Sequence, residues 1–198
     1  MKLIRYNFLI DCISALKPKK IVEIGLAMGH RSYGMISIAK KFNKEIEFVG
    51  YDVFDTKDSN WHRMVGNAKK VSSKIEIQNL LLKVSNNFKL IEGMTQDTLW
   101  NKSVVGDLVF IDGDHRVESI KLDYESVKKS KLVVFDDYYP EGKFANFTTE
   151  KYGCNQIIDK FPSNEVIITP KTIQFPDIRM AIWSKDIDLI NVLKKQIM

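Results

Sequence analysis

Acidic side chains and one histidine stand at the ends of two apolar runs, where they could bind a cation or move a proton. The runs cover residues 107–112 and 131–137, and the groups at their ends are Asp112, Asp114, His115, Asp136 and Asp137. Apolar residues between the runs recur at helical spacing, which predicts a strand, a helix and a second, parallel strand. Because ligands of open α/β sheets bind beyond the carboxyl ends of the strands, these side chains should converge in one crevice.

Carboxylates that converge without lysine or arginine partners repel one another and raise one another's pKa values. A hard divalent cation would relieve this repulsion, and Mg²⁺ fits a site that water and substrate oxygens complete. The alternative is structural, with Asp136 and Asp137 capping a turn or a helix start and Asp114 pairing with Arg116. Both interpretations stay open at this point.

His115 has the chemistry of a general base, because the unperturbed pKa of histidine, near 6.5, lets it accept a proton close to neutral pH. Neighbouring carboxylates would raise the pKa of His115, whereas a metal would lower it. The sequence does not decide between these effects. The other two histidines, His30 and His62, have no comparable position.

The elements that must position these groups follow an alternating pattern of strands and helices. An amphipathic packing helix over the first seventeen residues should end at Pro18. Strands are predicted at residues 19–25, 45–52, 87–93, 107–112, 131–137, 165–170 and 179–185. The last two are joined by a link too short for a crossover helix, so they should pair antiparallel. The predicted fold class is α/β, a doubly wound, mostly parallel sheet of about seven strands with one antiparallel strand near the C-terminus.

Two segments without a clear period could cover the crevice. Residues 53–73 leave from the carboxyl end of a strand and are expected to be partly helical, and residues 141–151 follow the last acidic pair. Side chains in and beside these segments could line an acceptor pocket: Trp61, Met64, Tyr138, Tyr139, Phe144 and Phe147. Packing over the core is the alternative role for these aromatic residues.

The loop after the first predicted strand could hold a nucleoside. Gly25 and Gly29 would let the backbone pass close to a bound molecule, and the next helix offers free N–H groups. The spacing is not GxGxxG, which disfavours a pyrophosphate and an NAD-dependent oxidoreductase. Glu23, before the glycines, favours a cationic or amine-bearing ligand, and Asp52 could accept both hydroxyls of a ribose. A positively charged nucleoside would satisfy both acids, whereas a tight turn without a ligand is the structural alternative.

These motifs resemble the class I S-adenosylmethionine-dependent methyltransferases over nearly the whole chain. The matching segments are VEIGLAMG, Asp52, LIEGMTQDTL, IDGDH and VVFDDY. The resemblance implies a Rossmann-like methyltransferase fold, S-adenosylmethionine as cofactor, and cofactor contacts from Glu23, Gly25, Ala27, Gly29, Asp52, Gly93, Met94 and Asp112. Such families often carry Ser-Thr where this chain has Arg31-Ser32. Arg31 would then bind the cofactor carboxylate through a salt bridge, in place of the usual hydroxyl contacts, with Ser32 beside it.

Within that group the acidic motif is similar to metal-dependent O-methyltransferases of the catechol, caffeoyl-CoA and macrolide-sugar types. The resemblance implies that Asp112, Asp136 and Asp137 bind the metal, and that His115, with Asp112, is catalytic. The sugar type has a histidine three residues after the first metal ligand, as His115 follows Asp112 here. It also has two consecutive acids at the end of the fifth strand, which Asp136 and Asp137 match. The resemblance implies methylation of a hydroxyl on a small molecule or sugar, with the metal stabilising the alkoxide.

Two other functions remain as alternatives. One is a non-catalytic subunit that binds the cofactor or a nucleoside, and the other is a methyltransferase for a nucleic-acid or amine acceptor. Amino-methyltransferases usually carry an Asn/Asp-Pro-Pro-aromatic run after the fourth strand, where this chain has IDGDH. The net charge of +5 is modest and its lysines are scattered, which argues against nucleic acid as a partner.

Length and composition favour one domain over residues 1–198, because 198 residues with 44% apolar content can build a single sizeable core. The two cysteines lie far apart, which disfavours a zinc site and is compatible with a reducing compartment. No apolar run is long enough to cross a bilayer and no signal-peptide pattern occurs, so a cytoplasmic location is expected. A homodimer is compatible with the sequence, which does not determine the oligomeric state.

Overall fold

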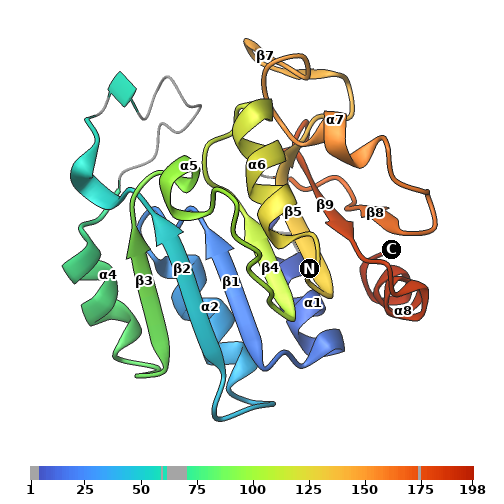
Figure 1. The fold of residues 1–198 in the computed structure, drawn as a ribbon. Helices are drawn as coiled ribbons and strands as arrows, with labels where there is room; N and C mark the ends of the chain where they lie inside the picture. The colour runs from blue at the N-terminus through green and yellow to red at the C-terminus, as the bar shows by residue number, and fades with distance from the viewer. Residues whose placement is uncertain (1–4, 59, 62–70, 174) are drawn as a thin grey trace.

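Seven strands form one sheet within residues 5–58, 60–61, 71–173 and 175–198, which the computed structural model describes (Figure 1). The strands are β1 (Lys20–Ile24), β2 (Glu47–Asp52), β3 (Phe88–Glu92), β4 (Leu108–Ile111), β5 (Leu132–Tyr138), β8 (Val166–Ile168) and β9 (Arg179–Trp183). Their order is β3-β2-β1-β4-β5-β9-β8. β9 pairs antiparallel with both β5 and β8, and the other neighbouring strands of this sheet pair parallel. The predicted doubly wound sheet, with its antiparallel strand near the C-terminus, is confirmed.

Helices cover both faces of the sheet, because side chains on successive strand residues point to opposite sides. Leu108 and Phe110 of β4 pack into one apolar cluster, and Val109 and Ile111 into the other. The first cluster includes α1 (Asn7–Leu16), α2 (His30–Ala39), α4 (Lys74–Leu81) and α8 (Ile187–Ile197). The second includes α6 (Val117–Val127) and α7 (Asn155–Ile158), while α5 (Thr95–Thr98) packs against α6. The helical spacing in residues 117–127 therefore identified a real crossover helix.

Local sequence signals explain several helix ends. Ser73 and Glu76 form a reciprocal capping box at the start of α4, and Asp186 caps α8. The sequence analysis did not anticipate α8, although Ile190 and Leu193 bury one face of it. The sequence pattern predicts a helix over residues 152–161, but α7 covers only Asn155–Ile158, because the chain leaves the helical conformation at Gly153, whose φ is +81°.

The described parts of the two covering segments, residues 53–58, 60–61, 71–73 and 141–151, contain little regular structure. Residues 53–73 begin with the short 3-10 helix η1 (Phe54–Thr56), and Trp61 lies in a helical turn. Met64 and His62, which belong to the predicted cover, lie outside the described residues. The segment after Pro140 forms a two-stranded hairpin, β6 (Lys143–Phe144) and β7 (Phe147–Thr148). Among the described residues, no helix is both long and apolar enough to span a membrane.

Candidate active site

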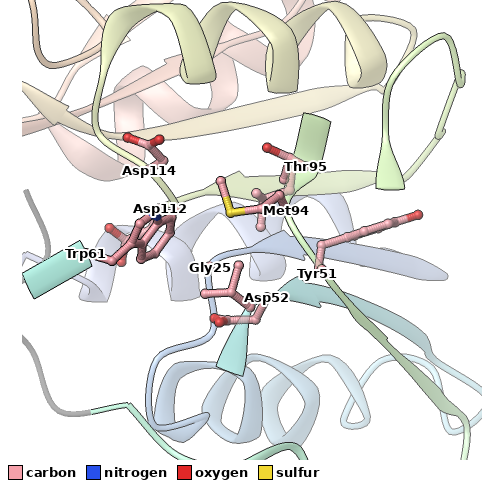
Figure 2. Close-up of a pocket in the computed structure, with 12 residues that line it drawn as sticks. Gly25, Tyr51, Asp52, Trp61, Met94, Thr95, Asp112 and Asp114 are labelled. Atoms are coloured by element: carbon pink, nitrogen blue, oxygen red, sulfur yellow. The ribbon is translucent and has the colours of Figure 1, made fainter. Parts of the chain in front are cut away.

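A cavity opens at the carboxyl ends of β1, β2 and β4, where the sequence predicted a nucleoside site (Figure 2). The space between its walls is about 480 Å³, part of which is open to solvent. Its lining comprises Ile24, Gly25, Tyr51, Asp52, Val53, Trp61, Gly93, Met94, Thr95, Asp112, Gly113 and Asp114. Five of the predicted cofactor-binding residues, Gly25, Asp52, Gly93, Met94 and Asp112, are therefore brought together.

Gly25 is required at the floor of this cavity by its backbone conformation and by its neighbours. Its φ is +87°, and a Cβ at this position would lie 2.1 Å from the carbonyl oxygen of Asp112. The Gly25 N–H donates to the Tyr51 carbonyl at 2.8 Å, which ties the loop to β2. The first predicted glycine thus lets two strand ends approach each other beneath the ligand space.

Asp52 organises the glycine loop. Its Oδ2 accepts hydrogen bonds from the N–H groups of Leu26 at 2.5 Å and Ala27 at 3.1 Å, and its Oδ1 accepts from Phe54 N–H at 2.6 Å. A carboxylate offers about four acceptor positions, so roughly one is left for a ligand. In this arrangement Asp52 can accept one ribose hydroxyl, whereas the predicted bidentate contact would require a loop amide to be released.

Glu23 and Ser32 lie beneath the loop and do not line the cavity. Glu23 is completely buried, and its Oε2 accepts a hydrogen bond from the Ser32 hydroxyl. Burial raises the pKa of Glu23 to about 7, against the opposing effects of Arg31 and Ser32. Ala27 and Gly29 also lie outside the cavity lining, and Gly29 instead caps α2 with a φ of +72°. These residues support the loop from below in this arrangement.

The acidic side chains that were predicted to converge do so, in a largely buried cluster. Arg5 Nη2 contacts both Asp136 and Asp137, and the latter contact is 2.5 Å. His115 connects Asp137, which lies 2.9 Å from its Nδ1, with Asp112, which lies 3.8 Å from its Nε2. Neighbouring parallel strands therefore deliver the three carboxylates to one cluster, and Asp112 also lines the nucleoside cavity.

The expectation that these carboxylates have no arginine partners is wrong. Arg5, immediately before α1, pairs with Asp136 and Asp137, and Arg31 of α2 pairs with Asp112. Cations of the chain thus occupy the contacts that the predicted Mg²⁺ would need. Among the described residues, no group of three or more His, Cys, Asp or Glu is arranged to hold a metal ion. The carboxylates do not fit a metal site in this arrangement.

Asp114 follows the structural alternative. It forms an ion pair with Arg116 at 2.5 Å and accepts a hydrogen bond from the Ser119 hydroxyl at 2.7 Å. Asp114 also lines the cavity, so its carboxylate is fixed there by these two partners.

The carboxylates control the protonation of His115. Burial alone lowers the pKa of His115, but the charges of Asp137, Asp112 and Asp136 and the hydrogen bond to Asp137 raise it to about 9. The same ion pair lowers the pKa of Asp137 despite its burial. The carboxylates therefore outweigh the effect of burial and favour the protonated form of His115 at neutral pH.

Backbone contacts hold the histidine and its acid partner in place. Asp137 has a φ of +56° at an irregularity in the pairing of β5 with β9, a conformation that costs about 1–3 kcal/mol unless the surroundings enforce it. The Gly153 N–H donates to the His115 carbonyl at 2.9 Å, and the Cys154 N–H donates to the Asp137 carbonyl at 3.1 Å. The chain before α7 thereby fixes both residues.

Sequence reasoning missed Arg5 and Tyr6, which complete the cluster from the N-terminal segment. The Tyr6 hydroxyl donates to Asp136 Oδ2 at 3.2 Å, and the Arg31 guanidinium lies 4.6 Å from the centre of the Tyr6 ring. A usable signal existed, because buried carboxylates need cationic partners and Arg5 interrupts an apolar stretch.

The aromatic residues expected around an acceptor divide into two groups. Trp61 lines the cavity, and the Tyr139 hydroxyl donates to Asp137 Oδ2 at 3.3 Å while its ring stacks on Phe144. The Tyr138 hydroxyl instead donates to Asp159, and Phe147 packs edge-on against Tyr152. Trp61, Tyr139 and Phe144 are therefore the predicted acceptor residues that lie nearest to the cavity or the acid cluster.

Solved structures with the same fold include several methyltransferases. An O-methyltransferase from Bacillus cereus in complex with SAH has a TM-score of 0.60 and 15% identity, over 91% of this chain and 80% of that one. The O-methyltransferase of tomaymycin synthesis from Streptomyces achromogenes, in complex with SAM, has a TM-score of 0.51 and 15% identity, over 89% of this chain and 78% of that one. A candidate caffeoyl-CoA O-methyltransferase from Staphylococcus aureus has a TM-score of 0.57 and 18% identity, over 93% of this chain and 85% of that one. At these identities the similarity establishes the fold alone.

A family model supplies the stronger evidence. A search of curated proteins gave no match. The family model described as a methyltransferase domain matches residues 22–138, which is more than half of the chain and includes the glycine loop, Asp52 and the acidic motifs. The resemblance inferred from the sequence is thereby confirmed, and the chain belongs to the methyltransferase-domain family.

Proposed function

We propose that this protein transfers the methyl group of S-adenosylmethionine to a hydroxyl of a small molecule or sugar. The observation that carries the proposal is the position of Asp112, which lines the cavity beside the glycine loop and lies 3.8 Å from His115 Nε2. A cofactor site and a group that can accept a proton therefore adjoin. The bound SAH and SAM in structures of the same fold support the choice of cofactor.

The cavity offers distinct contacts to each part of the cofactor. Gly93 and Met94 would border the adenine, Asp52 would accept one ribose hydroxyl, and Gly25 would let the backbone approach the methionine part. Glu23 would act indirectly, because it holds Ser32 and lies 3.9 Å from Arg31 Nε. When bound, S-adenosylmethionine supplies a methyl group on a positively charged sulfur, which an acceptor oxygen displaces in line.

His115 would remove the proton from the acceptor hydroxyl. Its Nδ1 lies 2.9 Å from Asp137, so an Nδ1–H donated to this carboxylate leaves Nε2, which lies 3.8 Å from Asp112, to accept the proton. Asp137 and Asp112 then stabilise the imidazolium. Because the pKa of His115 is about 9, only a small share of the protein holds the neutral base at pH 7.

The three carboxylates have roles in this proposal without a divalent ion. Arg5 pairs with Asp136 and Asp137, and Arg31 pairs with Asp112, so side chains of the protein offset the repulsion that the expected metal would have relieved. No step of the proposed reaction uses a metal.

Binding and turnover assays test the proposal together. Isothermal titration should detect one SAH or S-adenosylmethionine per chain, and a mass-spectrometric screen of sugars and catechols should find a product heavier by one methylene. Binding without turnover across a broad hydroxyl panel would favour the non-catalytic subunit instead. Folded protein that binds neither cofactor form would refute the proposal.

A further inference from the structure

The acid cluster contains a buried cation from its own chain. Arg5 is 4% exposed and Asp136 is 4% exposed, and one nitrogen of Arg5, Nη2, contacts both Asp136 and Asp137. Moving charges out of water is costly, and only close opposite charges offset that cost. An arginine buried between two carboxylates is therefore part of the site, unlike an exposed ion pair.

Aromatic rings hold Arg5 in this position from two parts of the chain. Its guanidinium lies 5.5 Å from the centre of the Tyr6 ring and 5.7 Å from that of Phe175, which belongs to the link between β8 and β9. Tyr6 also donates to Asp136, so the ring and its hydroxyl bind both members of the ion pair. The guanidinium is thus fixed by two charges and two rings.

Arg5 stands where a cation shared by Asp136 and Asp137 would have to stand. A divalent ion shared by both acids would lie about 2.0–2.6 Å from an oxygen of each. Nη2 of Arg5 already donates hydrogen bonds to Asp136 Oδ1 and Asp137 Oδ1. The third acid of the cluster, Asp112, is held by Arg31. An ion could enter only after the Arg5 guanidinium left a buried site, which would leave its own charge without a partner.

We infer that Arg5 replaces a divalent metal in this methyltransferase. Its guanidinium pairs with both Asp136 and Asp137 and, through Asp137, keeps His115 in place, so that the site neither binds nor needs a divalent ion. Arg5 is a positioning residue in this role, because its contacts are with the acids and the rings. The inference rests on the proposed function for the meaning of the cluster, but its test does not require the acceptor.

Binding of Mn²⁺, followed by electron paramagnetic resonance with SAH present and absent, tests the inference directly. Wild-type protein should leave Mn²⁺ free into the millimolar range, and EDTA should not change its affinity for SAH. Arg5→Met keeps an apolar stem and removes the charge, so this variant should bind Mn²⁺ at least about tenfold more tightly, because two buried carboxylates lose their cation. Arg5→Lys keeps a charge there and should exclude Mn²⁺ as the wild type does.

A matched control separates this effect from general loss of arginine. Arg179→Met removes an arginine whose guanidinium donates to the Pro176 carbonyl, and it should leave Mn²⁺ binding at the wild-type level. Stoichiometric Mn²⁺ binding by the wild type would overturn the inference, and so would a folded Arg5→Met variant with no gain in Mn²⁺ affinity. If Arg5→Met does not fold, the wild type and Arg5→Lys still decide, since Mn²⁺ binding to both would overturn it. A wild-type protein that does not bind SAH would instead contradict the proposed function.

Discussion

Replacing Gly25 by alanine should damage both the stability of the fold and the cofactor site. The added Cβ would lie 2.1 Å from the Asp112 oxygen, 2.5 Å from the Asp112 carbonyl carbon and 2.6 Å from the Gly113 Cα. Carbon and oxygen atoms normally approach to about 3.3–3.6 Å, so all three contacts are severe. Every contacted atom belongs to the backbone, and no side-chain rotation can relieve the overlap.

The surrounding hydrogen bonds decide how much the chain can yield. The Asp112 N–H donates to the Ile24 carbonyl at 2.8 Å, and the Gly25 N–H donates to the Tyr51 carbonyl at 2.8 Å. Making room means separating the ends of β1 and β4. Placing alanine at positive φ costs about 1–2 kcal/mol and overpacking adds about 1–3 kcal/mol, which gives a loss of about 2–5 kcal/mol.

Gly34→Ala is the matched control, because it adds the same methyl group in α2, where nothing lies within 4 Å of the new Cβ. Removing a glycine from a helix interior stabilises by up to about 1 kcal/mol. Thermal unfolding should therefore show Gly25→Ala lower by about 4–20 °C, since 1 kcal/mol shifts Tm by about 2–4 °C at this size, and Gly34→Ala unchanged or higher.

Calorimetric titration with SAH supplies the second readout. At a temperature where Gly25→Ala is still folded, its affinity should fall by at least about tenfold, or 1.4 kcal/mol, because the shifted loop closes the space beside Asp112. The affinity of Gly34→Ala should equal that of the wild type. The reasoning fails if Gly25→Ala unfolds within about a degree of the wild type and binds SAH normally.

Three further predictions concern buried ionisable groups. His115→Gln should lower turnover by roughly 100-fold or more while SAH affinity changes little, and an equal loss of both would assign His115 to cofactor binding. Wild-type turnover should rise with pH towards a pKa of about 9, because the base acts when neutral; a plateau already reached at pH 7 would contradict this. Asp123 is fully buried, and burial raises its pKa to about 7, so the stability linked to its proton is present below the unfolded pKa near 4 and lost as pH rises through 7. Asp123→Asn should therefore stabilise the protein at pH 8, by up to about 4 kcal/mol, and change it little at pH 4, which urea unfolding at the two pH values would test.

The strands could be predicted because their signal is local. Each of the parallel strands is a short apolar run that ends on a glycine or an acid, and the adjacency of β4 and β5 follows from the crossover helix between them. The helix α8 was missed although its buried apolar residues, Ile190, Leu193 and Ile197, recur at helical spacing. The shortened α7 depends on the backbone of Gly153, which the apolar pattern does not reveal.

The charge state of the site could not be predicted, because it depends on contacts between distant segments. Asp136 and Asp137 are adjacent in the sequence, but their cation, Arg5, comes from the other end of the chain. Periodicity assigned Arg5 and Tyr6 to a packing helix, and α1 does pack in the core. The pattern does not show where the start of α1 lies relative to β5. That position depends on how all the helices on this face of the sheet pack together.

Asp112 connects the glycine loop after β1 with the acid cluster. Its carbonyl oxygen lies where a Gly25 side chain would be, while its carboxylate pairs with Arg31 and faces His115. A ligand that shifts the end of β1 should therefore also shift Asp112, and with it the surroundings of the proposed base, His115. This coupling gives a physical reason to expect that cofactor binding changes the pKa of His115, so the pH dependence of turnover should be compared with the titration of His115 by NMR in the presence and absence of SAH.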